Sequence, residues 1–328
     1  GRGVVLFLAP SIALVGQTLR EWTAESSIPI FPICICSDPE VSKSKKKSDD
    51  DTDGYSVTDL AFPASTRVTD IVRQFRLAEK FHKDGVVVVF STYQSIAVVA
   101  NAQKEFQRDF DLIICDEAHH AAANTYRKIF DHFTPDKLIG FTATPNRGDK
   151  VRLDTVFSKI IFQRDLRWGI EHGYLCNIFC RRVNIGYDLS QVRTQRGDYA
   201  PGELDEAMEG TADAIAQAYR ELATGATLIF AVSVHHAEEI AKRIPGAVVV
   251  TGETKDRAAI IKAFTAGEIP CIVNCMVFTE GTDIPRVETV IIARPTQSES
   301  LYAQMVGRGL RLYPSKEKLN LIDCVGIT

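Results

Sequence analysis

The stretch DLIICDEAHHA (111–121) decides the fold that this sequence predicts, because four apolar residues run directly into two carboxylates and two imidazoles. Short apolar runs of this kind are typical of buried strands. In open α/β sheets, ligands bind beyond the carboxyl ends of the strands. The stretch therefore predicts a buried strand that delivers Asp116 and Glu117 to a ligand site.

Three further runs in the first half follow the same pattern, namely VVLFLA (4–9), VVVVFS (86–91) and LIGFTA (138–143). Helical patterns separate them, which is typical of parallel sheets wound with helices. Since the carboxyl ends of parallel strands share one edge of a sheet, the polar residues after these runs are expected to converge there. These residues are Pro10, Ser11, Thr92, Asp116, Glu117, Thr142, Ala143 and Thr144.

A second series of strands and helices predicts a second parallel sheet. A helix is expected over 203–223, followed by alternating elements that comprise TLIFAV (227–232), HHAEEIAKRI (235–244), AVVVTG (247–252), DRAAIIKAFTAG (256–267), CIVNCMVF (271–278), VETVIIAR (287–294), SLYAQMVGRGLRL (300–312) and LNLIDCV (319–325). Residues 157–184 lack the pattern. We therefore expect a first domain over 1–165, a connection over 166–184 and a second domain over 185–328.

The totals agree with two domains of ordinary composition. The 328 residues are 45% hydrophobic and 24% charged, which suffices for two cores without metals or disulfides. No segment approaches the roughly 20 apolar residues of a membrane span. The eight cysteines lie mostly in apolar runs and indicate reduced thiols of an intracellular protein. The net charge of −4 excludes a bulk positive field, so any grip on nucleic acid must be local.

The segment SDPEVSKSKKKSDDDTDGYS (37–56) has almost no apolar content and interrupts the first domain. Such composition predicts a solvated, flexible insertion. The alternative is that its KSKKK run forms a nuclear-import or nucleic-acid patch, although the adjacent DDD run offsets the positive charge.

Asp116 and Glu117 suit the chemistry of phosphoryl transfer. An Asp directly after a strand can hold Mg²⁺ at a phosphate, and the next Glu can orient or deprotonate a water. The alternative is that both residues simply favour the first turn of a following helix.

The segment QMVGRGLR (304–311) suggests a second part of the site. Gln304, Arg308 and Arg311 are spaced i, i+4 and i+7, which predicts one helix face. Gly307 and Gly309 would permit close backbone approach. Two guanidinium groups delivered in this way can stabilise a transferring phosphoryl group, whereas the alternative is a pair of surface arginines.

Eight short blocks occur in an order that resembles motifs Ia, Ib or Ic, II, III, IV, IVa, V and VI of a superfamily 2 helicase. They are APSIALVGQ, STYQS, DEAH, TATP, IFAVS, TGET, FTEGTDIP and QMVGRGLR. The motif sequences DEAHH and TATPNRGD, together with the pattern QxxGRxxR, resemble those of one helicase branch. This branch contains type III restriction subunits, transcription-coupled repair helicases and mitochondrial DNA helicases. This resemblance implies two tandem RecA-like α/β domains that use ATP and Mg²⁺ on nucleic acid, with DNA favoured over RNA.

The resemblance also implies a role for each matching position. Asp116 would bind Mg²⁺, Glu117 would activate water, and Gln304 would support Arg308 and Arg311 as arginine fingers. His119, Thr142, Ala143 and Thr144 would couple the nucleotide to the rest of the motor. Gly281 and Asp283 would touch the nucleotide. The positions along the nucleic-acid backbone would be Pro10, Ser11, Thr92, Gly252, Thr254 and Thr279.

One part of the family pattern is absent from the sequence, the phosphate-binding loop G-x-x-x-x-G-K-[ST]. No Gly-Lys dipeptide occurs in the 328 residues. We therefore expect a fragment that lacks the P-loop strand, leaves a gap inside the first sheet and is inactive alone. The alternatives are a degenerate nucleic-acid-binding module, or a different P-loop enzyme without a nucleic-acid substrate.

Overall fold

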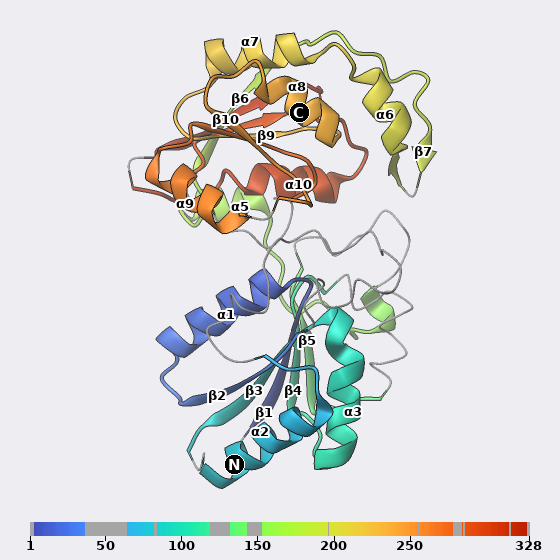
Figure 1. The fold of residues 1–328 in the computed structure, drawn as a ribbon, viewed down its shortest axis with the longest axis vertical. Helices are drawn as coiled ribbons and strands as arrows, with labels where there is room; N and C mark the ends of the chain where they lie inside the picture. Colours follow the sequence, from blue (N-terminus) through green and yellow to red (C-terminus); the bar gives the residue numbers. More distant parts are fainter. Residues whose placement is uncertain are drawn as a thin grey trace. The chain divides into compact units, whose positions relative to one another are not determined.

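The computed structural model of this chain forms two α/β units, Gly1–Ile161 and Phe162–Thr328. It describes residues 3–36, 64–81, 84–118, 132–142, 153–195, 197–254, 256–277, 284, 286–314 and 316–326. No helix among these residues is long and apolar enough to cross a membrane. Each unit is built around its own parallel sheet (Figure 1).

Unit 1 contains a five-stranded parallel sheet in the order β2-β3-β1-β4-β5. Its elements are β1 (Val4–Ala9), α1 (Ile12–Glu25), β2 (Ile30–Ile35), α2 (Val68–Phe81), β3 (Val86–Thr92), α3 (Ile96–Phe106), β4 (Leu112–Cys115) and β5 (Lys137–Gly140), with short 3₁₀ turns at Tyr93–Ser95 and Leu153–Thr155. The four strands expected in this half are therefore confirmed.

The alternation of side chains along β1 explains why helices cover both faces of the first sheet. Leu6 and Leu8 are buried in a cluster with residues of α2 and α3, whereas Phe7 and Ala9 are buried in a cluster with residues of α1. Figure 1 shows α1 on one side of the sheet and α2 and α3 on the other. A strand buried on both faces reads as a continuous apolar run, as VVLFLA does.

The gap that the sequence predicts inside the first sheet is not there in the described residues. Strand β1 pairs with β3 and β4, and β4 pairs with β5, so the order from β2 to β5 is continuous. The edge strand β5 has exposed or half-buried residues throughout, and Phe141, directly after it, is 58% exposed. A sheet can lose an edge neighbour without separating the strands that remain.

Unit 2 contains a six-stranded parallel sheet in the order β10-β11-β9-β12-β13-β6. Its elements are α5 (Leu166–Glu171), β6 (Asn177–Arg182), β7 (Thr194–Gln195), β8 (Asp198–Tyr199), α6 (Pro201–Ala207), α7 (Ala212–Leu222), β9 (Thr227–Phe230), α8 (Val234–Ala241), β10 (Ala247–Val250), α9 (Arg257–Ala266), β11 (Cys271–Asn274), β12 (Thr289–Ile292), α10 (Glu299–Gly307) and β13 (Lys318–Asp323). Strands β7 and β8 form a separate antiparallel hairpin. The predicted second parallel sheet is thus confirmed.

Two local expectations for unit 2 are wrong. The single helix expected over 203–223 is split into α6 and α7, because Gly210 has a left-handed φ of +80° that a continuing helix does not allow. The segment 166–184, expected as a connection, supplies α5 and the edge strand β6, which pairs with β13. An exposed edge strand lacks the apolar run by which a buried strand is found.

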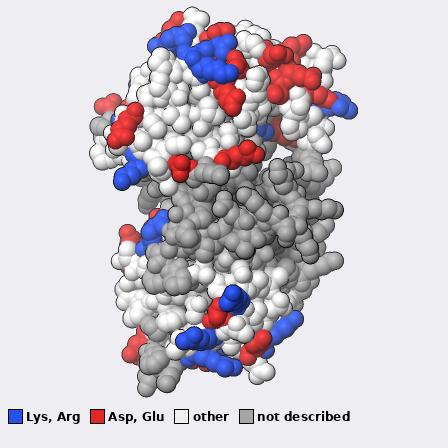
Figure 2. Space-filling view, in the orientation of Figure 1, with Lys and Arg blue, Asp and Glu red and all other residues white. Residues whose placement is uncertain are grey.

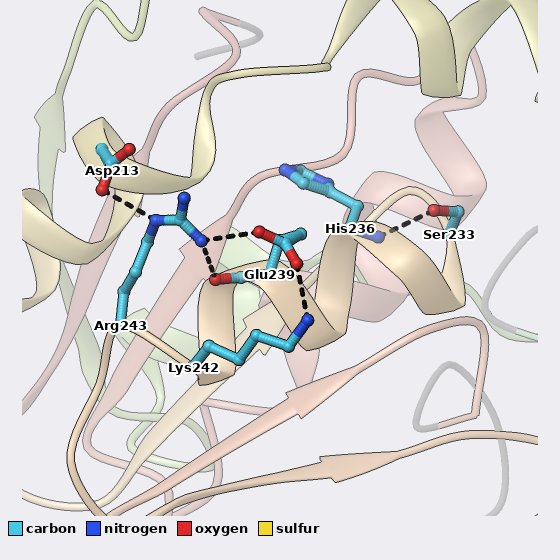
Figure 3. Close-up of polar contacts among 6 residues, drawn as sticks. All are labelled: Asp213, Ser233, His236, Glu239, Lys242 and Arg243. Atoms are coloured by element: carbon cyan, nitrogen blue, oxygen red, sulfur yellow. Dashed lines mark hydrogen bonds and ion pairs between the residues drawn. The ribbon is translucent and has the colours of Figure 1, made fainter.

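Helix α8 shows how local chemistry sets the surface of unit 2 (Figure 3). It begins at Ser233, whose Oγ accepts a hydrogen bond of 3.0 Å from the backbone N–H of His236. Arg243 joins Asp213 of the neighbouring helix α7 to Glu239 through hydrogen-bonded ion pairs of 2.7 and 2.8 Å. Hydrogen bonds from Lys242 and Arg243 lower the pKa of Glu239 to about 2. These pairs join α7 to the end of α8.

Candidate functional site

The first half of the candidate site is the edge where the strands of unit 1 end. The register places Ala9 beside Thr92, Leu8 beside Cys115, and Cys115 beside Gly140. The residues that follow β1, β3, β4 and β5 therefore leave the sheet at the same edge. This convergence was predicted from the sequence, and the pairing confirms it.

Asp116 and Glu117 form a tight turn directly after β4. The backbone N–H of Glu117 donates to Oδ1 of Asp116 at 3.0 Å, and the hydroxyl of Tyr93 donates to the carbonyl of Asp116 at 2.8 Å. Burial raises the pKa of Tyr93 well above its usual range, so its phenol stays a donor. Glu117 has φ of +46°, a left-handed conformation that costs free energy in a non-glycine residue. Tyr93 thus fixes the backbone that presents both carboxylates.

The turn after β4 is hydrogen-bonded to the segment that follows β5. The backbone N–H of Ala118 donates to the carbonyl of Phe141 at 2.7 Å. Gly140 makes the approach possible, because a Cβ there would lie 2.7 Å from the Cβ of Ala118 and 2.6 Å from the ring of Phe157. Thr142 follows directly and is half-buried. The two segments are therefore linked directly by this hydrogen bond.

Three of the residues expected along the nucleic acid also lie at this edge, and each has a local partner. Ser11 caps α1, since its Oγ accepts from the N–H of Leu14 at 3.3 Å. The carbonyl of Pro10 accepts a bond of 3.5 Å from Gln94. Thr92 is only 4% exposed, and its hydroxyl donates to Oγ of Ser95 at 3.2 Å. The Thr92 side chain does not face solvent, so it cannot contact a phosphate in this conformation.

The expectation that Gln304, Arg308 and Arg311 share one helix face is wrong. Helix α10 ends at Gly307, Arg308 is its C-cap, and Arg311 lies beyond it. The bonds Gly309 N–H to Val306 carbonyl at 3.0 Å and Leu310 N–H to Gly307 carbonyl at 3.2 Å tighten the chain into a turn. Two glycines in four residues disfavour a longer helix, which is the reason the spacing argument fails.

Lys316 holds the segment after α10 in place, a role that the sequence did not reveal. Its Nζ donates to the carbonyls of Gly309 at 2.6 Å and Arg311 at 2.7 Å. Burial lowers the pKa of Lys316. The backbone N–H of Cys176 donates to the carbonyl of Leu310 at 2.9 Å. The backbone from Gly309 to Arg311 is thus held by Lys316 and by Cys176, which is distant in the sequence.

Only one of the two glycines in this segment makes the close approach that the sequence predicts. A Cβ on Gly309 would overlap Leu319 and lie 2.8 Å from Cγ2 of Val290, whereas a Cβ on Gly307 would meet no atom within 4 Å. Gly309 therefore lets the segment between Arg308 and Arg311 pack directly against β12 and β13. Gly307 instead ends α10.

We expect Gly309→Ala to destabilise unit 2 by about 1–3 kcal/mol, since the added methyl group has no space in a packed core. The matched variant Gly307→Ala should be neutral or stabilising by up to about 1 kcal/mol, because alanine favours the helix end. Urea unfolding followed by Trp168 fluorescence measures unit 2, provided that Trp22 of unit 1 is replaced by Phe. Equal stability of the two variants would contradict the packing argument.

The loop after β10 carries Gly252 and Thr254, and a buried arginine organises it. Nη2 of Arg257 donates to the carbonyls of Thr251 at 2.8 Å and Gly252 at 2.7 Å, and Arg257 is only 2% exposed. The N–H of Thr251 donates to Oγ1 of Thr254 at 2.9 Å. The exposed Gly252 and half-buried Thr254 therefore lie on a rigid loop. Arg257 could not be recognised from the helical pattern DRAAIIKAF, which gives no sign that its charge is buried.

Asp198 of the β7–β8 hairpin is a second residue that the sequence did not reveal. Its carboxylate accepts from Oγ1 of Thr296 at 2.9 Å and from the N–H of Gln297 at 2.8 Å, and it lies 3.7 Å from Arg294. The hydroxyl of Thr194 adds a bond of 3.0 Å to Gln297. The hairpin thus holds the loop that precedes α10.

The residues at the first sheet edge fit a Mg²⁺ ion that is shared with a polyphosphate. Mg²⁺ usually takes one or two carboxylates, phosphate oxygens and waters, and Asp116 supplies such a carboxylate. No cluster of three or more metal-binding side chains occurs in the described residues, so an all-protein cage is not indicated there. Six predicted positions lie outside the described residues, namely His119, Ala143, Thr144, Thr279, Gly281 and Asp283.

Comparisons with known proteins agree with this arrangement. The family model "Type III restriction enzyme, res subunit" matches residues 2–147, and "Helicase conserved C-terminal domain" matches residues 210–313. A Saccharomyces cerevisiae protein provisionally named ATP-dependent helicase IRC3 is 36% identical over 262 residues, which cover 74% of this chain and 38% of that protein. A Schizosaccharomyces pombe protein provisionally named mitochondrial ATP-dependent helicase irc3 is 33% identical over 66% of this chain and 38% of its own length.

Solved structures show the same fold. The DNA-bound type ISP restriction-modification enzyme LlaBIII aligns with a TM-score of 0.72 at 20% identity, over 99% of this chain and 24% of that chain. The related enzyme LlaGI, in complex with a DNA substrate mimic, gives a TM-score of 0.61 at 23% identity, over 98% of this chain and 23% of its own. The two units are thus RecA-like domains. With both family models matched in order along one chain, this protein belongs to the superfamily 2 helicases.

Proposed function

We propose that this chain is the two-domain core of an ATP-dependent helicase or translocase that acts on nucleic acid, with DNA favoured over RNA. The observation that carries the proposal is the hydrogen bond between Ala118, beside the paired carboxylates, and Phe141, beside Thr142. This bond joins the turn that carries Asp116 and Glu117, which suit hydrolysis, to the segment that carries Thr142, which would couple hydrolysis to nucleic-acid contacts. The chain spans only 38% of the two yeast relatives, so the complete protein's activity is part of the proposal.

The chemistry assigned to unit 1 rests on its two carboxylates. Asp116 would hold Mg²⁺, which neutralises charge on the phosphates when it is bound. Glu117 would orient and deprotonate the attacking water, and the bond from Tyr93 to the Asp116 carbonyl would keep both side chains in place. His119, Thr142, Ala143 and Thr144 would pass a change at this turn to the nucleic-acid contacts.

The charge that develops during hydrolysis would be stabilised by unit 2. Arg308 and Arg311 would supply guanidinium groups, and Gln304 would support them from the last turns of α10. Gly281 and Asp283 would contact the nucleotide. Because Lys316 fixes the backbone carbonyls of Gly309 and Arg311, it would reduce the reorganisation needed when these arginines engage.

The phosphates of the nucleic-acid backbone would be bound by hydroxyl and backbone N–H groups rather than by a large positively charged surface. Ser11, Gly252, Thr254 and Thr279 offer hydroxyls and backbone N–H groups that can bind phosphates without reading sequence, and Pro10, which has no such donor, would lie beside them. On the face drawn in Figure 2, acidic side chains gather over α6 of unit 2 while Lys and Arg lie over α7. Patches of both signs on one face fit a net charge of −4 and local contacts with nucleic acid.

The test compares ATP turnover by this chain with turnover by a longer form that carries a G-x-x-x-x-G-K-[ST] loop upstream. We expect no nucleic-acid-stimulated turnover from residues 1–328 alone, because they contain no Gly-Lys dipeptide to cradle the phosphates. The longer form should hydrolyse ATP when DNA is added. Turnover by the short chain would contradict the assignment of an inactive fragment.

The missing dipeptide favours one alternative, a degenerate module that binds nucleic acid without ATPase activity. The retention of Asp116, Glu117, Arg308 and Arg311 favours the motor. A longer form that binds DNA but never hydrolyses ATP would support the alternative. For location we propose an intracellular compartment, and the mitochondrial name of the Schizosaccharomyces pombe relative makes the mitochondrion the first to examine.

A further inference from the structure

An array of stacked rings and one guanidinium group lies at the start of unit 2. The ring of Trp168 stacks on His172 with centroids 4.2 Å apart and planes 20° apart, and on Tyr174 at 5.4 Å and 14°. The guanidinium carbon of Arg164 lies 4.9 Å from the centroid of Trp168 and 4.7 Å from that of Phe162. We call these five residues the ring array. In this array the guanidinium group of Arg164 contacts the rings of both Phe162 and Trp168.

The backbone that carries the ring array is tightly folded. Oδ1 of Asp165 accepts from the N–H of Trp168 at 2.7 Å and caps α5. The helix ends at Glu171, Gly173 follows with a φ of +72°, and the N–H of Tyr174 then donates to the carbonyl of Gly169 at 2.9 Å. This helix-ending turn brings Tyr174 back beside Trp168. The rings are therefore pre-arranged, which lowers the entropy cost of binding a flat ligand.

The array presents apolar ring surface to solvent instead of burying it. Phe162 is 69% exposed and Tyr174 is 67% exposed. Aromatic pairs in the core of unit 1 include edge-on contacts, such as Phe7 with Trp22 at 61°. Parallel stacking leaves outward ring faces that can accept a further flat group, and a nucleobase is such a group.

One arginine of the array is exposed and can reach an anionic group. Arg164 makes no ion pair in the described part of the chain, and its contacts are the two rings and the carbonyl of Gln163. Arg167, with a side chain 85% exposed, pairs with Glu171 on the same helix. An exposed guanidinium between rings suits a strand whose bases stack while its phosphates stay in water.

We propose that the ring array of unit 2 binds single-stranded nucleic acid by base stacking, on Phe162 and Tyr174, with Arg164 beside the phosphates. The inference rests on the proposed function in that it assumes nucleic acid reaches this protein. It goes further, because the backbone contacts proposed above would not distinguish a strand with bases from one without. An apolar protein segment is the competing occupant, and the exposed guanidinium of Arg164 among the rings, which has no ion pair with any described residue, argues against it.

The test uses Trp168 as the reporter in a Trp22→Phe background, since the chain has two tryptophans. The full chain is titrated without nucleotide with oligo-dT, oligo-rU and an abasic oligonucleotide of equal length and charge. We expect oligo-dT and oligo-rU to quench Trp168, because bases stack on the array. The abasic strand should bind more weakly and leave the fluorescence unchanged. Quenching by only one of the first two would define the sugar that the array accepts.

A matched pair of variants separates stacking from general apolar contact. Tyr174→Leu keeps apolar bulk but removes the ring, and it should weaken oligo-dT binding about 5- to 150-fold, the range for loss of one stacked base. Tyr174→Phe keeps the ring and should bind within about 2-fold of the parent. Affinity for the abasic strand, measured by anisotropy of a dye label, should be the same in both variants.

The outcomes separate failure of this inference from failure of the proposed function. Equal binding of oligo-dT and the abasic strand, without a change in Trp168, would overturn the ring array while leaving the backbone grip intact. Full affinity in Tyr174→Leu would instead indicate an apolar docking surface and also overturn it. Absence of binding by all three oligonucleotides would contradict both proposals for this chain.

Discussion

Replacing Arg308 with alanine is expected to lower ATP turnover by about 10³- to 10⁵-fold, the range found when an arginine finger is lost. The measurement requires the longer form that carries the phosphate-binding loop. Arg308 lies at the C-cap of α10, and its backbone is set by the bond of its N–H to the Gln304 carbonyl at 3.3 Å. Its charge acts only as the phosphoryl group transfers, so nucleotide affinity should change by no more than a few-fold.

Two further variants make this result specific. Arg308→Lys keeps the positive charge without the planar fork and should recover only part of the lost rate. Arg243→Ala removes an arginine whose partners are Asp213 and Glu239 on the surface of unit 2 (Figure 3), and it should leave turnover unchanged. If Arg308→Ala lost nucleotide binding and turnover to the same extent, Arg308 would be a binding residue rather than a finger.

The stability of unit 2 is expected to fall by about 3 kcal/mol between pH 6.5 and pH 4, because His236 is buried in its neutral form. Burial lowers the pKa of His236 from 6.5 to about 4, against the opposing effect of Asp205. Above pH 6.5 neither the folded nor the unfolded state protonates this imidazole. Below that pH the unfolded state takes up a proton and the folded state does not, so stability decreases until the pH reaches about 4.

The hydrogen bonds of His236 explain why the neutral ring is retained. Its Nδ1 accepts from the N–H of Val232 at 3.4 Å, which leaves Nε2 as the donor to Oγ1 of Thr211 at 3.1 Å. A proton on Nδ1 would break the first of these bonds. The bond from Nε2 to Thr211, which joins α8 to the start of α7, would remain, so protonation costs the bond to Val232 and the burial of a charge.

Urea unfolding of unit 2 at several pH values, followed by Trp168 in the Trp22→Phe background, measures this effect. His236→Asn should lower stability at pH 7 but remove the slope between pH 6.5 and pH 4 that is due to this ring. The matched variant His235→Asn, at the exposed neighbouring position, should retain the slope. A slope that survives in His236→Asn would show that other groups cause the acid sensitivity.

Much of the fold could be predicted because each buried parallel strand corresponds to a short continuous run of apolar residues in the sequence. The runs at β1, β3, β4 and β9 are continuous apolar segments that lie close to their predicted positions. The edge strand β6 was missed because five of its six residues are exposed and it carries polar groups among the apolar ones. The split between α6 and α7 was missed because it depends on the φ of Gly210, which composition does not specify.

By itself, the sequence determined the two α/β series, the order of their motifs and the convergence of Asp116, Glu117 and Thr142 on one edge, since all of these follow from local patterns and strand direction. Only the tertiary structure decided that Gly309 packs on the sheet while Gly307 does not, and that Thr92 turns inward. The same holds for the contacts of Lys316, Asp198 and Arg257 and for the turn that completes the ring array. These features depend on side-chain packing and hydrogen bonds, often between residues far apart in the chain, which the spacing of neighbouring residues does not encode.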